Sequence, residues 1–203
     1  MSSTKEIERC PWAGVTGTEY ARYHDEEWGV PMTDARALFE KLTLEGFQAG
    51  LSWITILRKR ENFRKAFHNF DAARIARFTE RDIARLMNDE GIIRNRAKIE
   101  ATISNAKAYL ALTERVPFAQ FLWGFVDGRP IVNSVTSFKG IPTETDISKR
   151  MSKGLKAEGF RFVGSTTLYA FMQSTGMVND HLVSCFRHAA CAKLQKKLKI
   201  AGL

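Results

Sequence analysis

The stretch Thr79-Glu-Arg-Asp-Ile-Ala-Arg-Leu-Met-Asn-Asp-Glu-Gly91-Ile-Ile-Arg-Asn-Arg96 decides the expected fold. Thr79 and Asp82 have the spacing of a helical capping box, and the apolar residues that follow recur at helical spacing. Gly91 lies where a helix C-cap would be, and a second helix is expected over residues 94–112. The segment therefore predicts two helices joined by a tight basic turn.

Helical signals also dominate the rest of the chain. Capping residues precede amphipathic stretches that begin near Asp34 and Thr145, and the apolar run Thr166–Thr175 ends at Gly176. Residues 132–141 are the stretch best suited to a strand or to irregular structure, and they are too few to build a sheet. We expect an all-α protein in which 203 residues form one domain or two lobes with a shared core.

Composition favours a polyanionic partner for a folded protein. The chain is 44% hydrophobic and 26% charged, which is typical of globular domains and excludes a disordered chain. It carries 31 Lys and Arg against 22 Asp and Glu, a net charge of +9. This excess favours nucleic acid or anionic lipid as a partner, although many basic proteins bind neither.

The N-terminal stretch and the cysteines indicate the compartment. Residues 1–10 lack the apolar core of a signal peptide, and no window approaches the roughly 18 apolar residues of a membrane span. We expect a cytoplasmic protein without membrane contact, and a monomer by default from its size. In a reducing cytosol Cys10, Cys185 and Cys191 are expected to be thiols or metal ligands.

Two cysteines and two histidines form a candidate metal site. His181 and Cys185 are four residues apart, so they would share one face if this stretch were helical. With Cys10 and His24 they match the ligand set of a closed tetrahedral structural zinc site. Spacing alone leaves open the alternative that these side chains are simply buried on a helix face.

An acidic residue and several aromatic residues form a second candidate site. Glu45 lies among apolar neighbours, where an unpaired carboxylate is costly, so it is a candidate for recognition or catalysis. The alternative is that Glu45 is solvated and that the rings belong to the core. The nearby rings are Trp12, Tyr20, Tyr23, Trp28 and Trp53.

The basic turn is a third candidate site. Backbone N–H groups of a glycine turn that enters a helix form an anion site, and Arg94, Arg96 and Lys98 suit a phosphodiester. The alternative is a solvated charged face.

Together these motifs resemble one family over nearly the whole chain. The matching stretches are Arg9–Trp12, Tyr23–Pro31, Leu44–Trp53, Gly91–Arg96, Phe160–Gly164 and Val178–His181 with Cys185. In these stretches the sequence is similar to the 3-methyladenine DNA glycosylase I family, a branch of the helix-hairpin-helix DNA glycosylases. The resemblance implies two packed helical lobes, a helix-hairpin-helix lobe at 35–125 and a zinc-containing lobe at 1–34 plus 126–203.

The resemblance also implies an activity. A member of this family is a monofunctional DNA repair enzyme that flips 3-methyladenine out of alkylated double-stranded DNA. It hydrolyses the N-glycosidic bond, releases the free base and leaves an abasic site.

The roles that the resemblance implies fall on particular residues. One structural Zn²⁺ would be bound by Cys10, His24, His181 and Cys185. Glu45 would recognise the damaged base, beside Tyr23 and Trp53, with Trp12, Tyr20 and Trp28 also lining the pocket. The hairpin that holds the DNA backbone would consist of Gly91, Ile92, Ile93, Arg94 and Arg96. Gly50 and Leu51 would form the wedge that fills the stack left by the flipped nucleotide.

Two features depart from the wider superfamily. The hairpin lacks the usual Gly-Val-Gly form, and no aspartate follows where most of those enzymes keep a catalytic one. Either this branch works without that aspartate or this chain has lost activity, and the intact pocket residues favour the first explanation. Two other functions stay open: a non-catalytic zinc-stabilised DNA-binding module, and a zinc hydrolase, which four protein ligands disfavour because they leave no position for water.

Overall fold

A computed structural model describes residues 7–203 of the chain. The first six residues, part of the stretch used above to exclude a signal peptide, lie outside the described residues. Within residues 7–203, no helix is both long and apolar enough to cross a membrane. The described part is mostly helical, as expected, and it also contains a two-stranded sheet that the sequence did not predict. Its helices and strands are α1 (Glu19–Glu26), α2 (Ala35–Gln48), α3 (Trp53–Ala66), α4 (Ala72–Ile75), α5 (Glu80–Met87), α6 (Arg96–Thr113), α7 (Phe118–Trp123), β1 (Ile131–Val132), α8 (Asp146–Ala157), α9 (Ser165–Ser174), β2 (Val178–Asn179) and α10 (Phe186–Lys196).

The predicted caps begin the helices. Asp34 accepts a hydrogen bond from the Ala37 N–H at the start of α2, and Thr79 forms the capping box with Asp82 at the start of α5. Helix α6 begins two residues later than expected because the Asn95 side chain caps it. Side-chain acceptors at these positions satisfy N–H groups that have no partner inside the helix.

Gly91 has a different role from the one expected. Helix α5 ends at Met87 with Asn88 as its C-cap, and Gly91 lies three residues further along the chain. A Cβ at Gly91 would lie 2.9 Å from Asp89 Oδ1 and 3.0 Å from Asn62 Cβ. Gly91 is therefore needed for the close approach of neighbouring groups, not for a left-handed helix end.

The stretch from His181 to Cys185 is a turn instead of a helix. β1 and β2 pair in parallel, Ile131 with Val178, and an isolated bridge continues this pairing to Leu182. Because the backbone is held extended up to this point, the helix starts only at Phe186, and Cys185 becomes the N-cap of α10. His181 and Cys185 therefore do not share a helix face.

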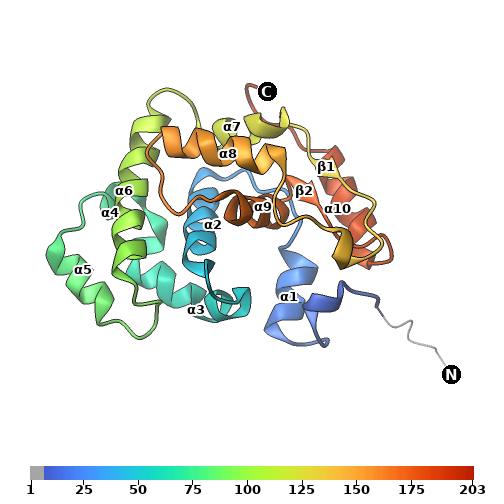
Figure 1. Ribbon diagram of the computed structural model, residues 1–203, viewed down its shortest axis with the longest axis horizontal. Helices are drawn as coiled ribbons and strands as arrows, with labels where there is room; N and C mark the ends of the chain where they lie inside the picture. Colours follow the sequence, from blue (N-terminus) through green and yellow to red (C-terminus); the bar gives the residue numbers. More distant parts are fainter. Residues whose placement is uncertain (1–6) are drawn as a thin grey trace.

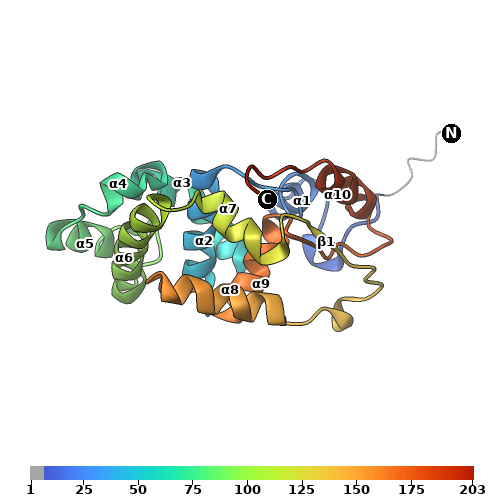
Figure 2. The same ribbon diagram turned by 90° about the horizontal axis from the view of Figure 1, so that it is seen from above.

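Helix α2 lies at the centre and packs against α3, α6 and α9. Figure 1 shows α4, α5 and α6 on one side of it and α1, α10 and the sheet on the other, with α3 running beneath it, and Figure 2 shows the same division along the longest axis. The core is rich in fully buried aromatic side chains, including Phe39, Phe47, Phe63, Phe67 and Trp123. These rings hold α2 rigidly, so the side chains that it presents to its neighbours are fixed in place.

Candidate functional site

One cavity of about 220 Å³ brings together the acidic and aromatic residues singled out in the sequence. This volume is below the roughly 300–1,000 Å³ of pockets for drug-sized ligands, so it suits a small flat molecule. The cavity lies where α1, α2, α9 and the start of α3 meet. It is lined by Trp12, Tyr20, Tyr23, Trp28, Glu45, Gln48, Trp53, Phe138, Ala170, Gln173 and Ser174.

The aromatic rings form a continuous wall. The rings of Tyr23 and Trp53 have centroids 5.4 Å apart, and the ring of Trp12 lies 5.1 Å from those of both Tyr20 and Trp28. Tyr20 and Tyr23 come from α1, which begins where the Thr18 side chain accepts a hydrogen bond from the Ala21 N–H. Such a wall offers π-faces that attract a positively charged ring.

Glu45 is buried and held by two polar neighbours. The residue is 3% exposed, and its Oε1 accepts a hydrogen bond of 3.0 Å from the Ser174 hydroxyl. Lys41 Nζ lies 3.4 Å from the same oxygen. Burial raises the pKa of Glu45, and the Lys41 charge opposes that rise. Both contacts fall on Oε1, so Oε2 is the oxygen available to a molecule in the cavity.

Several lining residues were not expected from the sequence. Gln48 lies one turn from Glu45 on α2, so helical spacing could have indicated it. Gln173 and Ser174 lie in a stretch that the sequence marked only as apolar, and Ser174 is 129 residues from its partner Glu45. No spacing signal connects positions so far apart.

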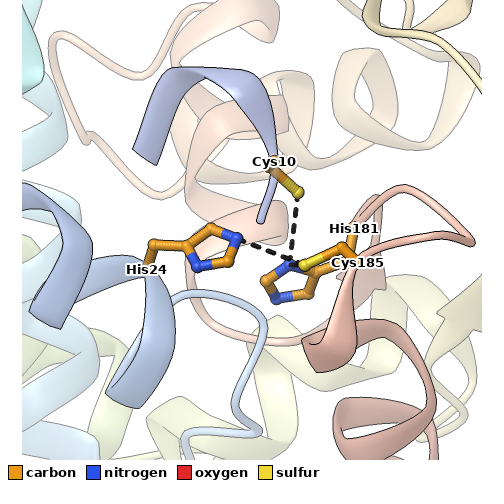
Figure 3. A group of neighbouring side chains, drawn as sticks. All are labelled: Cys10, His24, His181 and Cys185. Carbon is orange, nitrogen blue, oxygen red and sulfur yellow. Dashed lines mark hydrogen bonds between the residues drawn. The ribbon is translucent and has the colours of Figure 1, made fainter. Parts of the chain in front are cut away.

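The four candidate metal ligands converge in a second cluster. Their ligand atoms all lie within 4.8 Å of one another, and all four residues, Cys10, His24, His181 and Cys185, are buried. Figure 3 shows the side chains pointing toward one another, with His181 and Cys185 from the same turn and Cys10 and His24 from two other segments. Cys185 Sγ lies 3.5 Å from His24 Nε2 and 3.6 Å from His181 Nδ1, and Cys10 Sγ lies 3.5 Å from His181 Nδ1. These residues could hold a metal ion.

Neighbouring acceptors set the tautomers of both histidines. His24 Nδ1 lies 2.8 Å from Asp25 Oδ1, and His181 Nε2 lies 3.0 Å from the Trp28 carbonyl oxygen. Because a carboxylate and a carbonyl only accept, these two nitrogens carry the protons. In the neutral rings the lone pairs then face the cluster, on His24 Nε2 and His181 Nδ1. This is the arrangement that metal-binding histidines require.

The third cysteine lies outside this cluster. Cys191 is buried, and its thiol contacts the Trp28 carbonyl oxygen at 3.9 Å. Within the cluster, the hydrogen bond from the Cys10 thiol lowers the pKa of Cys185 against the effect of burial. The cluster thus favours a thiolate, the form of cysteine that binds metals.

The basic turn at residues 91–96 joins α5 to α6. Ile92 is buried in the core, whereas Arg94 and Arg96 are exposed. Arg94 lies 3.5 Å from Glu90, and Arg96 pairs with Glu80 at 2.6 Å and with Glu100 at 2.8 Å. Exposed ion pairs contribute at most about 1 kcal/mol, so an incoming phosphate can displace them.

Comparison with known proteins identifies the family. The methyladenine glycosylase family model matches residues 12–188. The chain belongs to this family. It is 54% identical over 178 residues to the DNA-3-methyladenine glycosylase of Haemophilus influenzae, a match that covers 87% of this chain and 96% of the relative.

Solved structures of the methyladenine glycosylase family share the fold. A crystal structure of a 3-methyladenine DNA glycosylase I is 53% identical, with a TM-score of 0.87, and the match covers 89% of this chain and all of that one. A second, of a variant in complex with 3-methyladenine, is 37% identical with a TM-score of 0.83, and covers 87% of this chain and 96% of the other. The helix-hairpin-helix glycosylase-like fold expected from the sequence is therefore confirmed.

Within this glycosylase fold, Lys98 does not join the exposed basic residues. It is buried, and its Nζ donates to the carbonyl oxygens of Phe47 at 2.8 Å and Ala49 at 2.6 Å. Lys98 thus satisfies carbonyls at the C-terminal end of α2, where a cation is also favoured by the helix dipole. It fixes the start of the turn at Gly50 and Leu51. Gly50 has a φ of +82°, and Leu51 is 41% exposed.

Proposed function

We propose that this protein is a DNA repair glycosylase that hydrolyses the N-glycosidic bond of 3-methyladenine in alkylated double-stranded DNA. It flips the damaged nucleotide, releases the free base and leaves an abasic site without lyase activity. The observation that carries this proposal is the aromatic cavity with the buried carboxylate of Glu45, in a chain of the methyladenine glycosylase family.

The chemistry of the substrate explains why no general acid is needed. Methylation at N3 makes the base cationic within the nucleotide, so the electron pair of the breaking glycosidic bond neutralises it as it leaves. Proton transfer to the leaving group is therefore unnecessary. Water adds to the sugar carbon after an oxocarbenium-like transition state and loses a proton to solvent.

The cavity recognises the base by charge and by shape. Glu45 Oε2 accepts a hydrogen bond from the exocyclic amine, and the rings of Tyr23 and Trp53 stack on the cationic base. Each such contact favours a cation by about 0.5–2 kcal/mol. Trp12, Tyr20 and Trp28 complete the wall. The carboxylate acts mainly in recognition, because excessive stabilisation of the cationic ground state would slow departure of the base.

In this proposal one lobe binds DNA and the other contains the metal cluster. Residues 35–125 form the helix-hairpin-helix lobe, in which Gly91, Ile92, Ile93, Arg94 and Arg96 hold the DNA backbone. Residues 1–34 and 126–203 form the lobe that contains the metal cluster. Gly50 and Leu51 belong to the helix-hairpin-helix lobe and lie in the chain between Gln48 and Trp53, two residues that line the base cavity, and they form the proposed wedge into the duplex.

The metal cluster is proposed to bind one structural Zn²⁺. Tetrahedral zinc with bonds of about 2.0–2.3 Å places its ligand atoms roughly 3.3–3.8 Å apart. The three separations of 3.5–3.6 Å between sulfur and ring nitrogen fit this geometry. When bound, the ion connects the segments near the two ends of the chain and stabilises the fold. The four protein ligands leave it no part in the reaction.

The decisive experiment is chromatography of the bases released from methylated duplex DNA. Release of free 3-methyladenine by the protein is the expected result. Binding to alkylated DNA without release would instead indicate a non-catalytic zinc-stabilised DNA-binding module and overturn the proposal.

Leu51→Ala is expected to slow base release from duplex DNA by about tenfold. Flipping costs a few kcal/mol of stacking, and the exposed Leu51 side chain is proposed to fill the gap. The melting temperature should stay within experimental error, because an exposed substitution changes stability by about 0.5 kcal/mol or less. Single-turnover excision from duplex and from single-stranded methylated DNA measures the effect, which should be smaller on the single strand.

Leu194→Ala is the matched control for that variant. Leu194 on α10 is 44% exposed, close to the exposure of Leu51, and does not line the base cavity. This control should excise normally. A Leu51→Ala protein that releases base from duplex DNA at the wild-type rate would remove Leu51 from the wedge.

A further inference from the structure

Lys41 contacts residues of the base cavity but does not line that cavity. It lies one helical turn before Glu45 on α2, and it is buried. Its Nζ donates to the Tyr23 hydroxyl at 2.7 Å, lies 3.4 Å from Glu45 Oε1 and sits 3.6 Å from the centroid of the Trp53 ring. A single ammonium group thus touches three residues of the base cavity.

Lys41 itself lies outside that cavity. It lines a second cavity of about 270 Å³, which is separated from the first by side chains that line both: Tyr23, Trp53 and Ser174. A base in the first cavity would therefore meet the Glu45 carboxylate, and Lys41 would act on the base only through its neighbours.

The charges around Lys41 leave Glu45 as its principal partner. At the C-terminal end of α1 it faces the C-cap residue Glu27, whose carboxylate makes two hydrogen bonds to Arg60 of α3. Arg64 of α3 is likewise paired with Glu40 at 2.7 Å. The remaining titratable groups are on α1: Glu26, which lines the second cavity, and Tyr20 and Tyr23. Burial raises the pKa of both phenols. The element that completes the surroundings, α9, contributes the neutral Ser174.

In the Lys41–Glu45 pair, each charge shifts the pKa of its partner in the direction opposite to the shift caused by burial. Burial lowers the pKa of Lys41 to about 8, and the Glu45 charge opposes that decrease. Lys41 is therefore still mainly protonated at neutral pH. Its charge in turn opposes the rise that burial produces in the pKa of Glu45.

We propose that Lys41 is the positioning residue of the base site: its ammonium keeps Glu45 ionised, holds Oε1 and leaves Oε2 to accept the hydrogen bond from the base. The inference rests on the proposed function. A carboxylate without a neighbouring cation would stabilise the cationic nucleotide in the ground state and slow departure of the base. A neighbouring ammonium reduces this stabilisation of the ground state while the carboxylate remains an acceptor.

The pH dependence of base release tests this role. Recognition requires ionised Glu45, so the rate should decrease as the pH falls through the Glu45 pKa. In Lys41→Met that pKa rises further, because an opposite charge within about 4–6 Å is lost, and the acid limb should move up by about 1–3 pH units. Lys41→Arg, which keeps the charge, should restore the limb toward its wild-type position. Single-turnover rates on methylated duplex DNA between about pH 5 and pH 9 measure both variants.

A double variant separates this effect from a general loss of packing. In the Glu45→Gln background the carboxylate is gone, so adding Lys41→Met should leave the position of the acid limb unchanged. Any titration of the DNA is common to both backgrounds. If the Lys41→Met protein does not fold, the same measurements are made on Lys41→Gln, whose side-chain amide can still donate a hydrogen bond to the Tyr23 hydroxyl.

The outcomes distinguish the two claims. A wild-type protein that releases no base overturns the proposed function and this inference with it. A wild-type protein that releases base, together with a folded Lys41→Met or Lys41→Gln variant whose acid limb is unshifted, overturns only the role of Lys41. The same shift in the Glu45→Gln background would also overturn it, because the effect would not pass through the carboxylate.

Discussion

Replacing Glu45 by glutamine is expected to reduce excision of 3-methyladenine by about 10- to 100-fold. A hydrogen bond to a charged group contributes roughly 1.5–3 kcal/mol, and about 1.4 kcal/mol corresponds to a factor of ten. Glutamine keeps the size of the side chain and one acceptor oxygen. It loses the negative charge that favours a cationic base and leaves the Lys41 ammonium without its partner.

Two measurements define this result. Single-turnover excision from methylated duplex DNA should be slower, and binding of free 3-methyladenine should be weaker. Metal content should be unchanged, because Glu45 contacts Ser174 and Lys41 and none of the four candidate metal ligands. Excision at the wild-type rate would contradict the proposed role of Glu45.

Glu40→Gln provides the matched control. Glu40 lies on the same helix, is partly buried, and pairs with Arg64 instead of lining the base cavity. The substitution removes one carboxylate from α2 in the same way. We expect it to retain excision, so that a loss specific to Glu45 reports on recognition and not on the charge of the helix.

Replacing Cys185 by serine is expected to abolish stoichiometric zinc binding and to lower the melting temperature by roughly 10 °C or more. Loss of a metal site is among the few changes that cost several kcal/mol, and each kcal/mol lowers the melting temperature by about 2–4 °C in a domain of this size. Cys185 is also the N-cap of α10 and lies between both histidines, so its loss disturbs the connection between the two ends of the chain. Elemental analysis and thermal denaturation measure the two effects.

Cys191→Ser separates loss of the metal from loss of a buried thiol. Cys191 is as buried as Cys185 but contacts the Trp28 carbonyl oxygen, to which a serine hydroxyl can also donate. The control should keep one zinc per chain and most of its stability. A Cys185→Ser protein with full metal content and an unchanged melting temperature would refute the assignment of this ligand.

The helices were largely predictable because their signals are local. The capping box of Thr79 and Asp82, the cap at Asp34 and the glycine after α9 each act within one turn of the chain. Interactions of this range depend on neighbouring residues alone, so the sequence contains them directly. The turn at His181 was different, since its conformation depends on pairing with a strand about 50 residues earlier.

The residues of the candidate site could be predicted from the sequence, but the contacts between them could not. Glu45 was recognisable because a carboxylate among apolar residues needs a partner or a use. Its actual partners are Lys41, one turn away, and Ser174, which lies in a different helix. Lys98 was expected among phosphate-binding residues, yet it points inward to the end of α2.

By itself, the sequence determined which residues could carry out chemistry here: a carboxylate, a set of aromatic rings, four metal-binding side chains and a basic turn. Only the tertiary structure decided how they act together. It places Lys41 and Ser174 on the same oxygen of Glu45, and it brings Cys10 within reach of His181. The physical reason is that burial and charge pairing depend on distance in space. The packing of α2 against α9 sets the distances around Glu45, and the approach of the chain segments that carry Cys10 and His181 sets those in the metal cluster.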